Sequence, residues 1–329
     1  MTRLGVRRRR PRPPDPVDLT STVGSVRLPN PVMTASGTGG HGAELGRYLD
    51  LGALGAVVTK SVAAEPWPGN PAPRLHETPN GMLNSVGLQG SGVNGWLHDD
   101  LPALVASGAR VVASIWGRTV ADYGRAAAAL AAAPSAVVAV EVNLSCPNVE
   151  DRSAMFAHSA EAIAAVMTAA EACGRPRWAK LSPNVTDVVE MAATAEAAGA
   201  EAVTLINTVM GMAIDPVTRR PRLGSGSKGG GLSGPAIRPV AVRAVFDVHA
   251  ARPDLPIVGV GGVVDAASAV ELLCAGASAV QVGTATFADP RAPATVLADL
   301  ARWCQRHGVR RVTDLVGAAH REPAGRFAP

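Results

Sequence analysis

Polar side chains and glycines follow most of the β-strands that this sequence predicts, at the points where the strands end. The segments concerned are Ala35-Ser36-Gly37-Thr38, Lys60-Ser61, Asn143 to Asn148, Lys180 to Asn184, Asn207-Thr208, Gly261-Gly262 and Gly283-Thr284. Enzymes built as α/β barrels carry their chemistry at the carboxyl ends of their strands. We therefore expect these groups to converge on one cavity.

Two glycine-containing turns follow the last two predicted strands. Gly261-Gly262 and Gly283-Thr284 expose backbone N–H groups at the usual phosphate site of a barrel, where amides and a helix N-terminus meet an anion. Tight turns between strands and helices also favour glycine, so neither turn alone would be specific. Together they predict a phosphate site, and the phosphate could belong to a substrate or to flavin mononucleotide (FMN).

Two lysines, Lys60 and Lys180, close predicted strands. An ammonium group in a barrel mouth must be paired or functional, because burying an unpaired charge is costly. One interpretation is a structural ion pair with an acid such as Glu141. Alternatively, a lysine can hold negative charge on a reduced flavin ring or form a Schiff base.

Cys146 lies between Ser145 and Pro147, directly after a predicted strand. Its position in a loop at the catalytic rim favours a functional thiol, whereas the other three cysteines fall in or near helices and are interpreted as packing residues: Cys173, Cys274 and Cys304. No C-x-x-C spacing indicates a metal or a cysteine-ligated cluster in this chain. Asn84, Asn143 and Asn207 could read the alternating donors and acceptors of a pyrimidine.

Short β-branched runs alternate with alanine-rich helical stretches. Eight strands are predicted, at 31–34, 56–60, 110–115, 136–143, 177–181, 202–207, 256–260 and 279–282. Helices are predicted between several of them, at 120–133, 159–173, 187–198, 237–250 and 266–275. Eight such units favour an α/β fold of the closed (β/α)8 TIM barrel type over an open sheet, which would need an early G-x-G-x-x-G fingerprint.

Two long stretches interrupt this rhythm, 61–101 and 210–235, and both are rich in glycine and proline. Loops of this length inside a compact domain are usually functional, so we expect loop insertions at the C-terminal rim, each with a small β-excursion. The expected organisation is a basic Pro/Arg-rich arm at 1–20, one catalytic barrel at 21–315 and a C-terminal tail at 316–329.

The net charge of +4 does not indicate a nucleic-acid partner. Residues 1–14 contain six arginines and no acid, so removing these six charges leaves −2 for residues 15–329. No apolar run is long enough to cross a membrane. The four cysteines, with no pairing pattern, are typical of a reducing cytoplasm, where we expect the protein.

The motifs together resemble the class 1 dihydroorotate dehydrogenases, and the NAD-linked class 1B catalytic subunit most of all. The matching segments span residues 30 to 290 in the family's order. They include Glu65-Pro66, Gly69-Asn70-Pro71, Pro73-Arg74, Gly81 to Asn84, Gly87 to Gln89, Asn143 to Asn148, Lys180 to Val185, Ile206 to Thr208 and Gly230 to Pro235, besides the two glycine turns.

The resemblance implies an FMN-binding barrel that oxidises (S)-dihydroorotate to orotate in de novo pyrimidine biosynthesis. Cys146 would remove the C5 proton while C6 gives a hydride to flavin N5. The implied cofactor residues are Ala35, Ser36, Lys60, Ser61, Ser114, Asn143, Lys180, Ile206, Gly234, Gly261, Gly262, Gly283 and Thr284. The implied substrate residues are Lys60, Asn84, Ser85, Val86, Gly87, Leu88, Asn143, Asn207 and Thr208.

Some positions depart from the family pattern. Ser114 stands where the family usually has asparagine, the usual glycine pair after the Cys-Pro-Asn motif is missing, and Trp67 and Trp116 are unusual near the mouth. We expect segment 149–158 to act as a lid. The departures keep open an alternative, a related flavin-dependent dihydropyrimidine dehydrogenase or a specialised paralogue that acts on another dihydropyrimidine.

The resemblance also implies partners. The chain is expected to form a homodimer, either on its own, as in fumarate-using class 1A, or within a heterotetramer. In that class 1B arrangement, a second subunit carries FAD and a 2Fe–2S cluster. A degenerate scaffold barrel and a Schiff-base enzyme that uses Lys60 or Lys180 remain the alternatives outside flavin chemistry.

Overall fold

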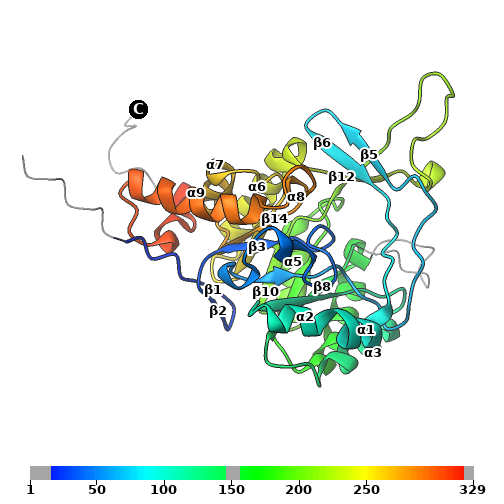
Figure 1. Cartoon of the computed structure of the whole chain (residues 1–329), viewed down its shortest axis with the longest axis horizontal. Coiled ribbons are helices and arrows are strands. Elements are labelled where there is room, and N and C mark those ends of the chain that lie inside the picture. The colour runs from blue at the N-terminus through cyan, green and yellow to red at the C-terminus, as the bar shows by residue number, and fades with distance from the viewer. Residues whose placement is uncertain (1–15, 146–155, 322–329) are drawn as a thin grey trace, which may run out of the picture.

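A parallel sheet of eight short strands forms the centre of the computed structural model, which describes residues 16–145 and 156–321. The strand order is β3-β14-β13-β10-β9-β8-β7-β4, and a parallel bridge from Met33 to Ala56 closes the ring. The strands are β3 (Val32–Thr34), β4 (Val57–Val58), β7 (Val111–Ile115), β8 (Val137–Asn143), β9 (Arg177–Lys180), β10 (Ala202–Leu205), β13 (Ile257–Val260) and β14 (Ala279–Val282). The predicted (β/α)8 barrel is confirmed (Figure 1).

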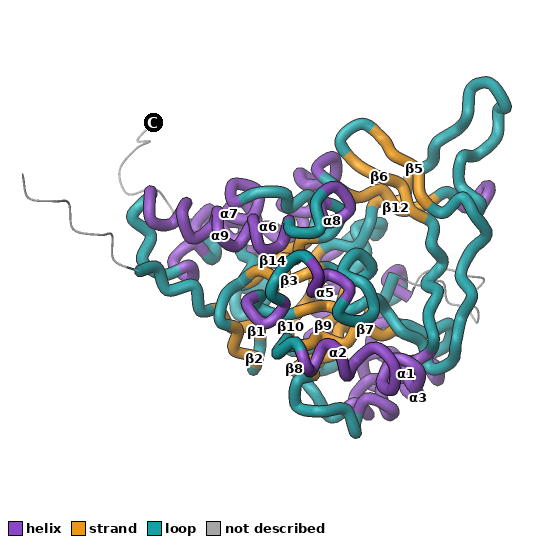
Figure 2. The backbone as a smooth tube through the Cα atoms, in the orientation of Figure 1, coloured by secondary structure: helices purple, strands orange, loops and turns teal. Residues whose placement is uncertain are grey.

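Helices surround these strands on the outside (Figure 2). The α-helices are α1 (Gly92–Gly95), α2 (Leu101–Ala106), α3 (Val120–Leu130), α4 (Ala160–Ala169), α5 (Val188–Ala197), α6 (Arg238–Ala251), α7 (Ala266–Ala275), α8 (Ala285–Ala288) and α9 (Ala292–Arg306). Shorter helical turns are η1 (Glu44–Arg47), η2 (Leu51–Ala53), η3 (Trp96–Asp100), η4 (Phe156–His158), η5 (Ala170–Cys173), η6 (Gly226–Lys228), η7 (Pro235–Ile237), η8 (Val312–Leu315) and η9 (Ala318–His320).

Polar caps set where several of the helices begin. The Thr119 side chain accepts from the Asp122 backbone N–H, and the Asp122 carboxylate accepts from the Thr119 backbone N–H; the two bonds form a capping box at the start of α3. Asp187 and Asp265 accept from amides of the first turns of α5 and α7. These caps fix the helix starts close to where the sequence predicts them.

A hairpin closes the lower end of the barrel, below the amino ends of its strands. Its strands are β1 (Ser21–Val23) and β2 (Val26–Leu28), paired antiparallel. Val23 and Leu28 are fully buried and pack against the lowest inward-facing side chains of the barrel, among them Trp178 and Val258. These hydrophobic side chains close the barrel from below.

The two long insertions meet above the opposite end. Strands β5 (Leu75–Thr78) and β6 (Gly81–Asn84) come from the first insertion, and β11 (Val209–Gly211) and β12 (Gly230–Ser233) from the second. Antiparallel pairing of β12 with β6 joins them into one four-stranded sheet in the order β11-β12-β6-β5. The predicted β-excursions are thus present, and Figure 1 shows them beyond the barrel at one side of its mouth.

Within the described residues, no helix combines the length and apolar character needed to cross a membrane. The predicted division of the chain into arm, barrel and tail stays a prediction, because residues 1–15 and 322–329 lie outside the described part.

Candidate functional site

A cavity opens at the carboxyl ends of the barrel strands, beneath the four-stranded sheet. Its empty space, including the open mouth, is about 1150 Å3. The predicted site residues on its wall are Ala35, Ser36, Lys60, Ser61, Asn84, Val86, Gly87, Leu88, Asn143, Lys180, Ile206, Asn207, Thr208, Gly234, Gly261, Gly262, Gly283 and Thr284. The structure thus brings together residues from seven barrel strands and from the rim insertion.

The two glycine turns lie side by side on this wall, because β13 and β14 are neighbours in the sheet. The backbone N–H groups of Gly262, Val263 and Thr284 have no hydrogen-bond acceptor within residues 16–145 and 156–321. Gly262 has φ +75, a conformation that favours glycine. Unsatisfied amides that face one cavity are suited to bind an anion.

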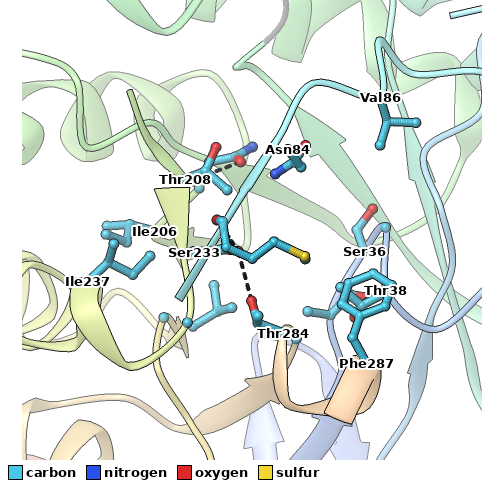
Figure 3. A pocket seen from close by; sticks show the side chains of 18 of the residues that line it. Ser36, Thr38, Asn84, Val86, Ile206, Thr208, Ser233, Ile237, Thr284 and Phe287 are labelled. Carbon is cyan, nitrogen blue, oxygen red and sulfur yellow. Dashed lines mark hydrogen bonds between the residues drawn. The ribbon is translucent and has the colours of Figure 1, made fainter. Parts of the chain in front are cut away.

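Thr284 also marks where the rim sheet meets the barrel. Its hydroxyl donates to the Ser233 hydroxyl at 2.8 Å, as Figure 3 shows. In the same view, Phe287 and Ser36 lie on one side of the mouth and Ile206 and Ile237 on the other. This side of the cavity is therefore built from both glycine turns and the second insertion.

A chain of hydrogen bonds runs along the cavity wall from Ser36 to Asn207. The Ser61 hydroxyl is 3.2 Å from the Ser36 hydroxyl and 2.8 Å from the Ser114 hydroxyl. It also accepts from the Asn143 amide at 3.3 Å, and the Asn143 carbonyl oxygen accepts from Asn207 at 3.1 Å. The side-chain amides that the sequence predicts for ring recognition therefore have fixed orientations.

Lys180 reaches the cavity from inside the barrel and is paired. Its ammonium lies 3.7 Å from Glu141 Oε1 and donates to the side-chain carbonyl oxygen of Gln281 at 3.1 Å. The expectation that a mouth lysine pairs with Glu141 is met by Lys180. Lys60 lies on the cavity wall and near His41. Burial and the positive charge of Lys60 lower the pKa of His41.

The segment from Asn84 to Leu88 forms the side of the cavity under the rim sheet. The Asn70 side-chain amide donates to the Ser85 hydroxyl at 2.9 Å, and the Asn70 backbone N–H donates to the Val86 backbone carbonyl at 3.0 Å. A Cβ atom on Gly87 would lie 2.5 Å from the Asn70 amide nitrogen, so the two segments can approach this closely only with glycine at 87.

Two predicted contact residues are not on the wall. Ser114 is fully buried behind Ser61, and the Ser85 side chain faces Asn70. Cys146 and most of the predicted lid at 149–158 lie outside the described residues. Gly37 and Thr38, expected among the strand-end groups, are also on the wall, whereas several wall residues were not predicted: Leu75, Met82, Ser233, Ile237, Val260, Val263, Val264, Ala285 and Phe287. Most of them adjoin a recognised motif, and that adjacency was the available signal.

The fold and the polar cavity at the strand ends define a (β/α)8-barrel enzyme. A family model described as dihydroorotate dehydrogenase matches residues 18–303. The catalytic subunit of dihydroorotate dehydrogenase B (NAD+) from Pelobacter propionicus is 46% identical over 302 residues, which cover 92% of this chain and 98% of that protein. The corresponding subunit from Desulforudis audaxviator is 49% identical over 300 residues, 91% of this chain and 96% of its own.

The chain belongs to the dihydroorotate dehydrogenase family. Both relatives carry the class 1B name that the motifs pointed to, so the predicted family and the predicted oxidoreductase class are confirmed. Oxidation of dihydroorotate, predicted from the same motifs, is the reaction of this family.

Proposed function

We propose that this chain is a class 1B-type catalytic subunit that uses FMN to oxidise (S)-dihydroorotate to orotate in pyrimidine biosynthesis. The observation that carries the proposal is the convergence of two glycine turns, two lysines and three asparagines on one cavity. A cytoplasmic location belongs to the same proposal, and the free thiols of Cys173, Cys274 and Cys304 support it.

The cavity fits FMN at both ends of that molecule. The open amides beside Gly261, Gly262, Gly283 and Thr284 suit the phosphate, which is an anion that accepts several hydrogen bonds. The ring and ribityl chain would meet Ala35, Ser36, Lys60, Ser61, Asn143, Lys180, Ile206 and Gly234. When bound, FMN supplies the acceptor for a hydride.

Dihydroorotate would occupy the space between the ring and the segment from Asn84 to Leu88. Its carboxylate is suited to the Lys60 ammonium, and the donors and acceptors of its ring edge are suited to the amides of Asn84, Asn143 and Asn207. Because Asn143 and Asn207 are already bonded to one another, their orientations are set before substrate binds. Preorganised partners of this kind reduce the cost of ordering on binding.

Cys146 is the proposed base. Its thiolate would take the proton from C5 of the substrate, while the hydride leaves from C6. The residue lies outside the described part of the chain, but the strand that leads to it ends at Asn143, on the cavity wall. The predicted lid that follows would exclude water from this step.

The electron acceptor is proposed to be NAD+, reached through a second subunit that carries FAD and a 2Fe–2S cluster. Among the described residues, no group of three or more histidines, cysteines or acids is arranged to hold a metal. The word "subunit" in the names of the relatives agrees with such a complex. A homodimer at its centre is part of the same proposal.

The test is an anaerobic absorbance spectrum of the purified protein before and after addition of dihydroorotate. We expect a yellow protein that dihydroorotate bleaches, with uracil and dihydrouracil without effect. Bleaching by dihydrouracil alone would favour the alternative, a dihydropyrimidine dehydrogenase-type enzyme, which the exchange of the usual asparagine for Ser114 keeps open. A colourless protein would contradict the flavin altogether.

A further inference from the structure

The inside of the barrel is built in three layers. Inward-facing residues alternate along each strand, so Ala139, Glu141 and Asn143 of β8 lie one above another. Ala139 belongs to the apolar layer at the closed end, and Asn143 lines the cavity. Between them, strands β8, β9, β10 and β14 contribute a polar middle layer: Glu141, Lys180, Thr204 and Gln281. A barrel interior is usually filled by branched apolar side chains, so this layer calls for an explanation.

The four side chains of the middle layer form one connected network. Glu141 Oε2 accepts from Gln281 at 2.7 Å and from Thr204 at 3.1 Å. The Gln281 carbonyl oxygen in turn accepts from the Lys180 ammonium at 3.1 Å. Gln281 therefore bridges the acid and the lysine, and its amide orientation is fixed by donating to one and accepting from the other.

Glu141 Oε1 has no hydrogen-bond donor within the described residues, yet it lies 3.7 Å from the Lys180 ammonium. The Glu141 side chain is fully buried and that of Lys180 is 7% exposed. Two charges removed from water at this distance interact strongly, and loss of either leaves the other without compensation. Glu141 is thus the counter-charge that allows Lys180 to stay protonated here.

Lys180 connects the middle layer to the cavity, since its ammonium donates to Gln281 in that layer and its side chain lines the cavity above. Within the described part of the chain, Lys60 is the other charged side chain on the cavity wall. Gln281 and Thr204 are neutral, so Glu141 supplies the negative charge among the side chains that contact Lys180.

We propose that Glu141, with Gln281 as its bridge, is a positioning residue that keeps Lys180 protonated and directed into the cavity. The proposal rests on the proposed function, because the charge so presented would stabilise the negative charge that a flavin gains on reduction. Glu141 does not touch the cavity and acts through Lys180. The network would thereby tune how tightly the site holds reduced relative to oxidised cofactor.

The test is the reduction potential of the bound flavin in Glu141→Gln, Lys180→Met and the double variant, measured by titration with a chemical reductant and a reference dye. Glu141→Gln should weaken binding of reduced relative to oxidised cofactor by about tenfold at pH 8, which lowers a two-electron potential by about 30 mV. Lys180→Met should lower the potential at least as much. The double variant should match Lys180→Met, because Glu141 has no effect without the lysine.

A control variant inside the barrel separates this role from a purely structural one, because a structural disturbance alone would not depend on the presence of Lys180. Val112→Ala is the matched control, because Val112 belongs to the apolar layer at the closed end and its cross-strand partners, Val58 and Ala139, are outside the network; the small cavity it opens should leave the potential unchanged.

An unchanged or raised potential in Glu141→Gln, or additive effects in the double variant, would overturn the inference. The titration does not use dihydroorotate. A yellow protein that this substrate fails to bleach would therefore contradict the proposed substrate and leave the inference about Glu141 standing on its own potentials. A colourless wild-type protein would overturn both.

Discussion

Asn143 shows how much a single side chain of this site is determined by its neighbours. Its amide nitrogen donates to Ser61, and its carbonyl oxygen accepts from Asn207 and from the Ser145 amide at 3.2 Å. The Tyr123 hydroxyl donates to its backbone carbonyl at 2.7 Å. The sequence predicts that Asn143 faces the cavity, because it ends a strand. The sequence does not predict the partners, since these depend on where the other strand ends lie.

The pH dependence of the reductive step should report Cys146. An ordinary thiol has a pKa of about 8.5, and the thiolate is the form that removes a proton, so the rate of flavin bleaching by dihydroorotate should rise with pH through that region. Cys146→Ala should slow bleaching by about a hundredfold or more, since a positioned base contributes at least that factor. Stopped-flow absorbance measures both, and a rate that does not vary with pH would argue against a thiol base.

The lowered pKa of His41 leads us to expect a loss of stability in mild acid. Burial, followed by the positive charge of Lys60, lowers its pKa below the usual 6.5, while Asp100 and Glu44 act in the opposite direction. The unfolded chain then binds the proton more tightly than the folded one, so the free energy of unfolding should fall as the pH drops through about 6.5 toward the lower folded value. Above pH 7 the imidazole is neutral in both states and this contribution is constant.

Urea unfolding at pH 7.5 and 5.5 tests this expectation. Replacement His41→Gln should reduce the difference between the two midpoints. His98→Gln is the control, because its side chain is 88% exposed and its ion pair with Asp99 lies in solvent, where such pairs contribute little to stability, so the substitution should leave the difference close to that of the wild type. If the midpoints of His41→Gln and of the wild type differ by the same amount between pH 7.5 and 5.5, His41 does not cause the loss of stability. His249, whose pKa is also lowered by burial, should account for part of the midpoint difference that remains in His41→Gln.

At the scale of elements, Arg74 anchors the segment that lines one side of the cavity. Its guanidinium donates to the Asn70 carbonyl at 2.6 Å and to the Pro68 carbonyl at 3.1 Å, and also contacts the Gln89 side chain. Asn70 in turn holds Ser85 and Val86. These contacts join both ends of the segment that carries Asn84 to Leu88.

Arg74→Met should therefore raise the KM for dihydroorotate by about tenfold, because charge-assisted hydrogen bonds of this kind are each worth about 1.5 kcal/mol or more. The rate at saturating substrate should change much less, since Arg74 is not on the cavity wall. Steady-state kinetics with an artificial electron acceptor separate the two constants. Arg243→Met, at an exposed position on α6, is the control, and an equal effect there would contradict a specific role for Arg74.

The elements differ in how far the sequence predicts them. The eight barrel strands and five of the helices follow from local periodicity and end within a few residues of the expected positions. The hairpin β1–β2 was not predicted; it lies before the first predicted strand and outside the alternation of strands and helices on which the prediction rested. The joint rim sheet depends on β12 pairing with β6, as Gly231 pairs with Asn84, and no local pattern specifies a pairing over such a separation.

At the scale of the whole molecule, the chain should need a partner to reduce NAD+. Purified alone, with FMN bound, it should oxidise dihydroorotate with an artificial dye as acceptor and show no activity with NAD+. Addition of the electron-transfer subunit encoded with a relative should restore NADH formation, followed at 340 nm. Fumarate-dependent turnover by the chain alone would place it with the class 1A arrangement instead.

The hairpin β1–β2, which closes the lower end of the barrel, also bears on the order in which product and cofactor dissociate from the cavity. With that end closed, cofactor, substrate and product would pass through the mouth beneath the rim sheet, the opening formed by the described residues. If the substrate stacks on the outer face of the flavin ring, the ligand must leave before the ring can. Orotate should then slow the loss of FMN when the protein is diluted, although it binds no part of the phosphate site. Because the lower end of the barrel is closed, bound orotate would keep FMN in the enzyme.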